Sequence, residues 1–223
     1  MRALLLLIAV SLAGCTRPAP LPASRSEAKP QAAQPASPVM RLQCIRQENG
    51  ATFTQHGTAV AVDGRAFGLA PSVLLTAAHV VDRGEALVEA SPGWLRATPA
   101  KRDEGLDLAL LYPALPLDGA LELDTAPLMD GARVEIIAAV EGQPVRSAPG
   151  IVGGRHGEHE IRWGVEARGF GHGSSGGAVL RGGKLAGLIV ALVPSSQGEP
   201  CALVFIPALR IRHFLQDAGG RAP

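Results

Sequence analysis

The most distinctive stretch of this sequence reads Gly171-His172-Gly173-Ser174-Ser175-Gly176-Gly177-Ala178. Its glycines let the backbone turn sharply and point successive N–H groups into one concavity. A flexible Gly-Ser hairpin is the simpler interpretation when the stretch is taken alone. Its meaning therefore depends on what the rest of the chain offers.

Two segments further upstream each place a reactive side chain beside an apolar strand. A histidine follows a buried strand and a tight turn in Leu75-Thr76-Ala77-Ala78-His79, so we expect His79 at a rim rather than mid-sheet. A carboxylate interrupts an apolar stretch in Gly105-Leu106-Asp107-Leu108, and a buried carboxylate needs a partner such as an imidazole N–H. Singly, His79 also fits a capped core histidine, and Asp107 a strand-edge residue. The order His, Asp, Ser indicates one catalytic constellation.

Composition favours a protein of many short strands. Among 223 residues there are 27 Gly and 18 Pro, and hydrophobic residues make up 47% of the chain. Short apolar runs between Gly and Pro predict strands rather than long helices. The 21 basic and 20 acidic residues give a formal charge of +1, which argues against a nucleic-acid partner.

The predicted strands fall into two groups that meet near residue 118. They cover residues 57–63, 73–76, 86–89, 95–99 and 108–111, and then residues 132–139, 151–153, 161–165, 178–180, 185–192 and 202–206. We therefore predict an all-β domain over residues 40–223. It consists of two packed β-barrels of about six strands each, over residues 40–118 and 119–207, and a short C-terminal helix over 208–217.

The three segments resemble the motifs of the chymotrypsin-like (trypsin-like) serine peptidases. The family's motifs are matched by Thr76-Ala77-Ala78-His79, by Asp107-Leu108-Ala109-Leu110 and by Gly173-Ser174-Ser175-Gly176-Gly177. The resemblance implies a double six-stranded β-barrel with the active site between the barrels. It also implies that Ser175 attacks a carbonyl, His79 transfers the proton and Asp107 orients His79, while the N–H groups of Gly173 and Ser175 form the oxyanion hole.

Two neighbouring residues compete for these roles. Ser174 is the rival nucleophile, although the register of the motif favours Ser175. Asp103 is the rival acid, but its segment is charged and lacks the apolar flank that follows Asp107.

The family's register also locates the primary specificity pocket. Its base is expected near Gly169, with Phe170 and Ala191 as further pocket residues. Because no Asp stands at the base, the resemblance does not imply a preference for Lys or Arg side chains. Small or medium apolar side chains are expected instead, and Phe170 or His172 is expected to narrow the pocket or contact the leaving-group side.

Further matches resemble the peptidase domain of bacterial HtrA-like enzymes. They are Gly131-Ala132-Arg133-Val134, Gly150-Ile151-Val152 and Phe205-Ile206-Pro207. HtrA-like proteins usually carry PDZ domains after the peptidase, and none is expected here because the sequence ends at Pro223. Ser174 stands where zymogen-activated members have Asp, so activation by N-terminal cleavage is not expected.

The N-terminus resembles the signal of bacterial lipoproteins. A basic start is followed by an apolar run over residues 4–12 and by Leu12-Ala13-Gly14-Cys15. The run is shorter than the roughly 20 apolar residues of a membrane span. The resemblance implies that residues 1–14 are removed and that Cys15 is lipidated. The Pro/Ala-rich composition that follows predicts that residues 15–39 form a tether. An ordinary secretory signal with an incidental Cys15 is the alternative.

The residue after the lipidated cysteine indicates in which membrane the chain is anchored. Thr16 stands where Asp would favour retention in the inner membrane of many Gram-negative bacteria. We therefore expect the chain to be anchored in the outer membrane of the cell envelope and to face the periplasm.

Two cysteines remain once Cys15 is lipidated. An exported chain meets conditions that permit disulfides, so Cys44 and Cys201 are predicted to pair. Two unpaired buried thiols are the alternative. Catalytic thiol chemistry is not expected, because neither cysteine has an activating histidine near it in sequence.

A short tract contains two histidines, but their spacing does not match that of a metal-binding motif. It reads His156-Gly157-Glu158-His159-Glu160, which is not His-Glu-x-x-His and has no evident third ligand. We predict a solvated turn there, and neither a metal nor a cofactor is expected.

The sequence thus predicts a serine endopeptidase, tethered by lipid in the bacterial cell envelope, that acts on protein or peptide substrates. A catalytically idle lipoprotein that keeps the fold as a binding module is the alternative. A non-peptidase acyl hydrolase or a structural envelope lipoprotein is a third hypothesis. No pattern in the sequence encodes the natural substrate or the oligomeric state.

Overall fold

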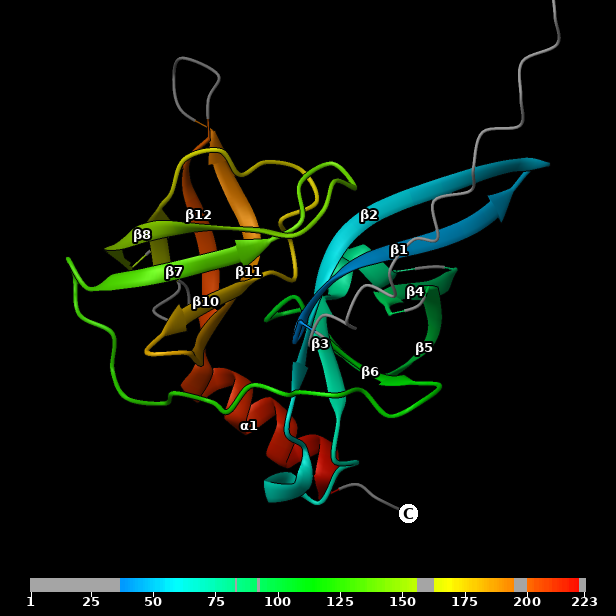
Figure 1. Ribbon diagram of the computed structural model, residues 1–223, viewed down its shortest axis with the longest axis horizontal. Coiled ribbons are helices and arrows are strands. Elements are labelled where there is room, and N and C mark those ends of the chain that lie inside the picture. The colour runs from blue at the N-terminus through cyan, green and yellow to red at the C-terminus, as the bar shows by residue number, and fades with distance from the viewer. Residues whose placement is uncertain (1–36, 83, 92, 156–162, 195–199, 221–223) are drawn as a thin grey trace, which may run out of the picture. The chain divides into compact units, whose positions relative to one another are not determined.

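Antiparallel strands dominate the described part of the chain (Figure 1). The computed structural model describes residues 37–82, 84–91, 93–155, 163–194 and 200–220, apart from the side chains of Pro194, Pro200 and Cys201. The predicted signal, Cys15 and most of the predicted tether lie outside these residues, as does the tract from His156 to Glu160.

Six strands close into a first barrel in the order β1-β2-β3-β6-β5-β4. Every one of them except β1 overlaps a predicted strand. β1 was missed because its buried Leu42 and Cys44 alternate with Arg41 and Gln43, which breaks up the apolar runs on which the prediction relied. The strands are β1 (Val39–Glu48), β2 (Ala51–Val62), β3 (Val73–Ala77), β4 (Glu85–Ala90), β5 (Gly93–Asp103) and β6 (Leu108–Pro113), with two 3₁₀ turns, η1 (Arg65–Phe67) and η2 (Ala78–Val81).

Six further strands close into a second barrel in the order β7-β8-β9-β12-β11-β10. They are β7 (Arg133–Ala138), β8 (Arg146–Arg155), β9 (Trp163–Glu166), β10 (Ala178–Arg181), β11 (Lys184–Pro194) and β12 (Pro200–Pro207), followed by the helix α1 (Ala208–Gly219). The predicted all-β double six-stranded barrel with a short C-terminal helix is therefore confirmed. Within the described residues, no helix combines the length and the apolar character needed to cross a membrane.

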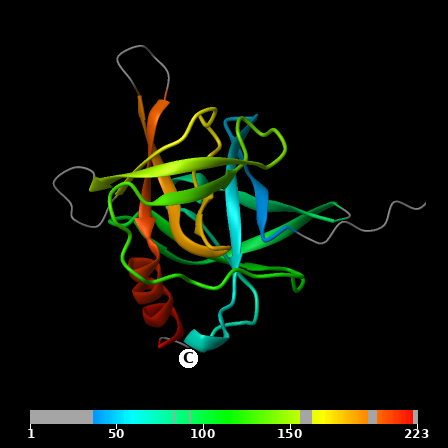
Figure 2. The same cartoon turned by 60° about the vertical axis from the view of Figure 1, so that its left-hand side comes forward.

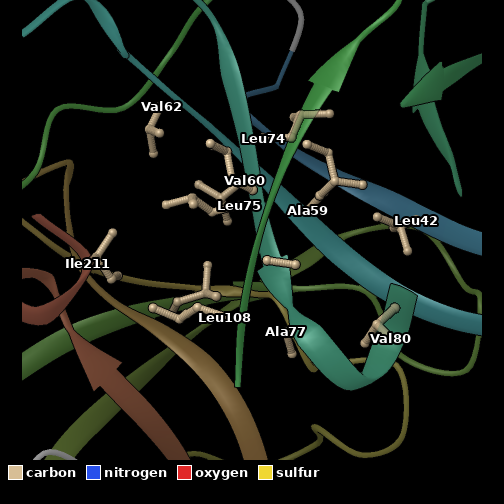
Figure 3. Packing of buried hydrophobic residues seen from close by; sticks show 14 of the residues in the cluster. Leu42, Ala59, Val60, Val62, Leu74, Leu75, Ala77, Val80, Leu108 and Ile211 are labelled. Carbon is tan, nitrogen blue, oxygen red and sulfur yellow. The ribbon is translucent and has the colours of Figure 1, made fainter. Parts of the chain in front are cut away.

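Buried aliphatic side chains fill the barrels. Val60, Leu75 and Leu108 of the first barrel are fully buried and gather with Ile211 of α1 in Figure 3. Phe214 also belongs to this cluster. The helix follows the last strand of the second barrel, yet it packs on the core of the first and lies beside η1 (Figure 2). It therefore ties the two barrels together.

The connection between the barrels, residues 114–132, is bound to both of them. Leu121 forms a parallel bridge with Val62 of β2, and Leu123 forms one with Leu185 of β11. These bridges hold the connection along the first barrel and then along the second.

An ion pair fastens the end of this connection. Arg181 of β10 donates from Nε to Asp124 Oδ2 at 2.6 Å, and its terminal nitrogens donate to the carbonyls of Ala126 and Pro127 at 2.9 and 3.0 Å. The Arg181 side chain thus binds three residues of the connection.

The two cysteines that were predicted to pair lie in different barrels. Cys44 is buried in β1 with 3% of its surface exposed. Cys201 belongs to β12, and its side chain lies outside the described part of the structure. Their pairing stays a prediction.

Replacing Asp124 with Asn tests the fastening of the connection. Hydrogen bonding from Arg181 holds the pKa of the Asp124 carboxyl below its ordinary value of 3.8. The pair therefore stabilises the fold at neutral pH, and this contribution is lost as the pH falls below 3.8 through the lowered pKa. We expect Asp124→Asn to lower the free energy of unfolding by about 1 kcal/mol at pH 7.

Urea unfolding of the wild type and of Asp124→Asn between pH 7 and about pH 2 measures the difference in their free energies of unfolding. The two unfolding curves should converge on the acid side. A difference in the free energy of unfolding that stays constant over the whole pH range would contradict a stabilising role for the Asp124–Arg181 pair.

Candidate active site

His79 lies at the rim of the first barrel, where β3 ends. β3 is buried along its whole length, and the chain turns into η2 directly after it. The His79 side chain is 46% exposed, and its carbonyl accepts a hydrogen bond from Gln55 Nε2 at 3.1 Å. The sequence prediction of a rim position for His79 matches this placement.

Both carboxylate oxygens of Asp107 are directed at His79. Oδ1 accepts the backbone N–H of His79 at 2.9 Å, and Oδ2 lies 2.7 Å from His79 Nδ1. Because an ionised carboxylate only accepts hydrogen bonds, the ring proton belongs on Nδ1, which leaves Nε2 with a free lone pair. The pair therefore sets both the tautomer and the orientation of the ring.

The backbone of Asp107 adopts a conformation that few residues other than glycine enter. Its φ is 59°, in the left-handed region. The Asp107 carbonyl accepts the N–H of Ala78 at 3.0 Å. Main-chain and side-chain bonds to the start of η2 therefore hold this strained residue in place.

The side chains of the two rival residues, Asp103 and Ser174, bind nearby backbone groups and not His79. Asp103 Oδ1 accepts the N–H of Leu106 at 2.9 Å and so closes its own turn. Ser174 is fully buried, and its Oγ accepts the N–H of Gly171 at 3.3 Å. The structure thus brings Asp107 to His79, and it leaves Ser174 inside the fold.

Ser175 and His79 line one pocket of about 440 Å³. In the described structure, no hydrogen bond joins the Ser175 and His79 side chains. A hydrogen bond between a nucleophile and its base often becomes short only when substrate binds. The pocket joins η2 of the first barrel to the glycine-rich turn of the second. Its remaining lining residues are Gln55, His56, Glu141, His172, Gly173 and Leu192.

The turn that carries Ser175 requires glycine. Gly173 has φ 90° and Gly176 has φ 85°. A Cβ on Gly176 would lie 1.9 Å from the carbonyl oxygen of Thr58 in β2. Only a residue without a side chain lets the turn approach the first barrel this closely.

Two backbone N–H groups of this turn are held in fixed directions. The carbonyl of His172 accepts the N–H of Glu141 at 2.7 Å, and the carbonyl of Ser174 accepts the N–H of Gly177 at 2.9 Å. In a trans peptide the N–H points away from the carbonyl, so the N–H groups of Gly173 and Ser175 point away from these partners. Neither of them donates a hydrogen bond within the described residues. Both N–H groups are therefore open donors, and both residues line the pocket that His79 shares.

Buried Thr58 connects β2 to this turn. Its N–H donates to the carbonyl of Ser175 at 2.9 Å, and its hydroxyl donates to the carbonyl of Gly173 at 2.9 Å. The same hydroxyl accepts the N–H of Ala139, just after β7, at 2.9 Å. Thr58 therefore holds the turn from the opposite barrel, although sequence analysis gave it no role.

The predicted specificity residues do not line the pocket that Ser175 and His79 share. Gly169 lies in a turn with φ 82°. Phe170 is 3% exposed in the core of the second barrel, and the Arg146 guanidinium lies 5.2 Å from its ring centroid. Ala191 is half-buried in β11, next to Leu192, which does line the pocket. The role of the three residues in specificity stays a prediction.

Three polar residues of the pocket were given no role in the site from the sequence: Gln55, His56 and Glu141. Gln55 and His56 belong to β2, whereas the predicted strand began only at residue 57 and so left both of them out. Glu141 lies in an exposed turn with φ 50°. No local pattern marks such a turn as part of a site.

No group of three or more His, Cys, Asp or Glu side chains in the described ranges is arranged to hold a metal ion. His156 and His159 fall outside those ranges, so the predicted solvated turn stays a prediction.

Comparison with known proteins fits this geometry. A sequence model described as "Trypsin-like peptidase domain" matches residues 57–188, which is more than half of the chain and includes His79, Asp107 and Ser175. No curated protein sequence matches the chain. The chain is similar in structure to the Rv3671c protease from M. tuberculosis in its active form, with a TM-score of 0.66, 20% identity and coverage of 83% of this chain and 82% of that one. At this identity the likeness shows a shared fold. On the family match, the chain belongs to the trypsin-like peptidase domain family.

Proposed function

We propose that this chain is a serine endopeptidase that cleaves peptide bonds through an acyl-enzyme. One observation carries the proposal: Asp107 holds His79 with both oxygens, and His79 shares its pocket with Ser175. Membership of the peptidase family supports this chemistry. The segments that resemble HtrA-like enzymes support a place among those bacterial peptidases.

The first half of the reaction forms the acyl-enzyme. Ser175 Oγ attacks the substrate carbonyl while His79 Nε2 takes the hydroxyl proton. The carbonyl oxygen becomes an oxyanion, which accepts hydrogen bonds from the N–H groups of Gly173 and Ser175. Asp107 stabilises the imidazolium, and His79 then delivers the proton to the leaving amine as the peptide bond breaks.

The second half releases the product. Water enters the space that the amine has left, and His79 Nε2 takes its proton as the water attacks the ester carbonyl. The same two N–H groups hold the second oxyanion. Collapse of this intermediate breaks the bond to Ser175 Oγ, which recovers the proton from His79, and the enzyme returns to its starting state.

We also propose that the peptidase is attached to the bacterial envelope by a lipid on Cys15. The support is the sequence Leu12-Ala13-Gly14-Cys15 after a short apolar run. Several acyl chains on one cysteine give durable anchoring, because each buried methylene contributes about 0.8 kcal/mol. Thr16 supports the outer membrane as the location, with the peptidase domain facing the periplasm.

Substitutions in the triad test the peptidase proposal. We expect Ser175→Ala to lower kcat on an unfolded protein substrate by about a million-fold. Asp107→Asn should lower it by about ten-thousand-fold, because an amide donor on Nδ1 favours the tautomer whose Nε2 already carries a proton. Ser174→Ala and Asp103→Asn are the matched controls and should retain most of the wild-type kcat.

Peptide cleavage by each folded variant, verified by its unfolding midpoint, gives these values. Loss of activity in Ser174→Ala but not in Ser175→Ala would reverse the assignment. A correctly folded wild type that cleaves no peptide bond would favour the idle binding module.

Thr58 is expected to act on the rate through the glycine-rich turn. Thr58→Val keeps the shape of the side chain but removes the hydroxyl, so the Gly173 carbonyl and the Ala139 N–H both lose a buried partner. An unsatisfied buried group costs about 1–3 kcal/mol, so we expect kcat to fall by about ten-fold or more with little change in KM.

Thr58→Ser supplies the control, because it restores the hydroxyl and should restore most of kcat. Steady-state kinetics of the three proteins decides the question. An unchanged kcat in Thr58→Val, or an equal loss in both variants, would show that the hydroxyl does not position the turn.

Removing the lipidation site tests the anchor. In a Gram-negative host, the wild type should fractionate with the outer membrane and carry an acylated Cys15 at its N-terminus. Cys15→Ala should leave the membrane fraction, whereas Cys44→Ala should stay in it. Gradient fractionation with mass spectrometry of the N-terminal peptide makes the measurement, and an unaltered distribution of Cys15→Ala would rule the anchor out.

A further inference from the structure

The turn between β7 and β8 has a backbone conformation that its sequence does not favour. The N–H of Gln143 closes the turn by donating to the carbonyl of Val140 at 2.8 Å. Between them, Glu141 has φ 50° and Gly142 has φ 73°. Positive φ at both central positions is typical of a type I′ turn, where Asn-Gly is a preferred pair and glutamate is unfavourable. The 140–143 turn therefore needs support from its surroundings.

Arg41 of β1 supplies such support from the opposite barrel. Its Nη1 donates to the carbonyl of Gly142 at 2.7 Å. In Figure 1 the connection between β7 and β8 extends toward the β1–β2 hairpin, which brings the 140–143 turn within reach of this side chain. The turn is thus bound to the first barrel at the carbonyl of its second residue with positive φ.

Two neighbours fix the direction of the Arg41 guanidinium. Its Nε and Nη2 both donate to the carboxylate of Glu89 in β4. The ring centroid of Trp94 in β5 lies 5.4 Å from the guanidinium carbon. Because a bidentate pair holds the planar group in one orientation, the remaining nitrogen Nη1 stays directed at Gly142.

The other side of the turn holds the peptide bond between His172 and Gly173. The N–H of Glu141 donates to the carbonyl of His172 at 2.7 Å. Rotation of this peptide would break that bond and turn the N–H of Gly173 away from its present direction. Thr58 binds the carbonyl of Gly173, which belongs to the next peptide bond, so it does not replace Glu141 here.

We propose that Arg41 is a positioning residue for the proposed oxyanion hole. It holds the 140–143 turn, the turn holds the carbonyl of His172, and this carbonyl sets the direction of the Gly173 N–H. The inference rests on the proposed peptidase function. Neither Arg41 nor Glu89 lines the pocket of Ser175 and His79, so their effect on the reaction is indirect. An oxyanion donor acts mainly in the transition state, and Arg41 should therefore affect kcat more than KM.

Replacing Arg41 with Met tests this role. Methionine keeps an apolar side chain beside Trp94 but offers no donor to Gly142, so the turn loses its support. We expect kcat to fall by about ten-fold or more with little change in KM, because removing an oxyanion donor outright costs about 100- to 1,000-fold in kcat. Steady-state kinetics on a peptide substrate gives both values.

Arg46→Met is the matched control. Arg46 lies in the same strand, pairs with Glu48 at 3.8 Å and places its guanidinium 5.2 Å from the ring centroid of Phe53. These contacts do not involve the 140–143 turn, so kcat should stay at the wild-type value. Unfolding midpoints verify that both variants are folded. A wild-type kcat in Arg41→Met, or an equal loss in both variants, would overturn the proposal.

A second substitution tests whether Arg41 acts through the turn. Asparagine enters the left-handed region more readily than glutamate, and Glu141→Asn places the Asn-Gly pair in the turn. The turn should then hold its conformation without Arg41. In the Glu141→Asn background, Arg41→Met should lower kcat by only about two-fold. Both proteins of this comparison carry Glu141→Asn, so a direct effect of residue 141 on the substrate cancels. The same loss in both backgrounds would overturn the proposal.

Crystal structures separate this inference from the catalytic proposal. In Arg41→Met the N–H of Glu141 should no longer bind the carbonyl of His172, whereas in Arg46→Met it should. This result would stand even if the wild type cleaved no peptide bond, in which case the proposed function alone would fail. An unchanged bond in Arg41→Met would overturn the inference and leave the proposed function standing. If Arg41→Met does not fold, Glu89→Gln takes its place, because it weakens the pair that directs Arg41 at the turn.

Discussion

The hydrogen bonds of Thr58 are the interaction on which the proposed catalytic arrangement rests. One barrel supplies His79 and Asp107, and the other supplies the turn with Ser175, so neither barrel holds a complete site. Thr58 is fully buried in β2 and binds the turn through its N–H and its hydroxyl. The missing side chain of Gly176 lets the two barrels approach closely enough for these bonds to form.

The pairing of Asp107 with His79 depends on a local constraint of a different kind. Asp107 accepts hydrogen bonds from His79 at both carboxylate oxygens, and its backbone adopts a left-handed conformation to do so. The buried strands β3 and β6 pair directly beside it, through Ala77 and Leu108. Rigid strands on both sides of the turn can hold a conformation that an isolated turn would avoid. The same strands place the histidine ring at the rim, where substrate can reach it.

The parts that could be predicted from sequence are those with a local signature. Continuous apolar runs such as residues 73–76 and 108–111 became strands, and the order of the histidine, aspartate and glycine-serine segments predicted which side chains would meet. The strand β1 had no such run. Thr58 had no signature either, because its partners Gly173 and Ala139 lie 115 and 81 residues away in the chain. Contacts at that separation arise from how the barrels pack.

Covalent labelling with a fluorophosphonate probe tests the central claim most directly, because the probe reacts only with a serine that a neighbouring base activates. The folded protein is incubated with the probe and digested, and the modified residue is located by mass spectrometry. The account predicts one phosphonylated residue, Ser175, and no labelling of His79→Ala. Phosphonylation of Ser174, equal labelling of wild type and His79→Ala, or an unlabelled folded wild type would contradict it.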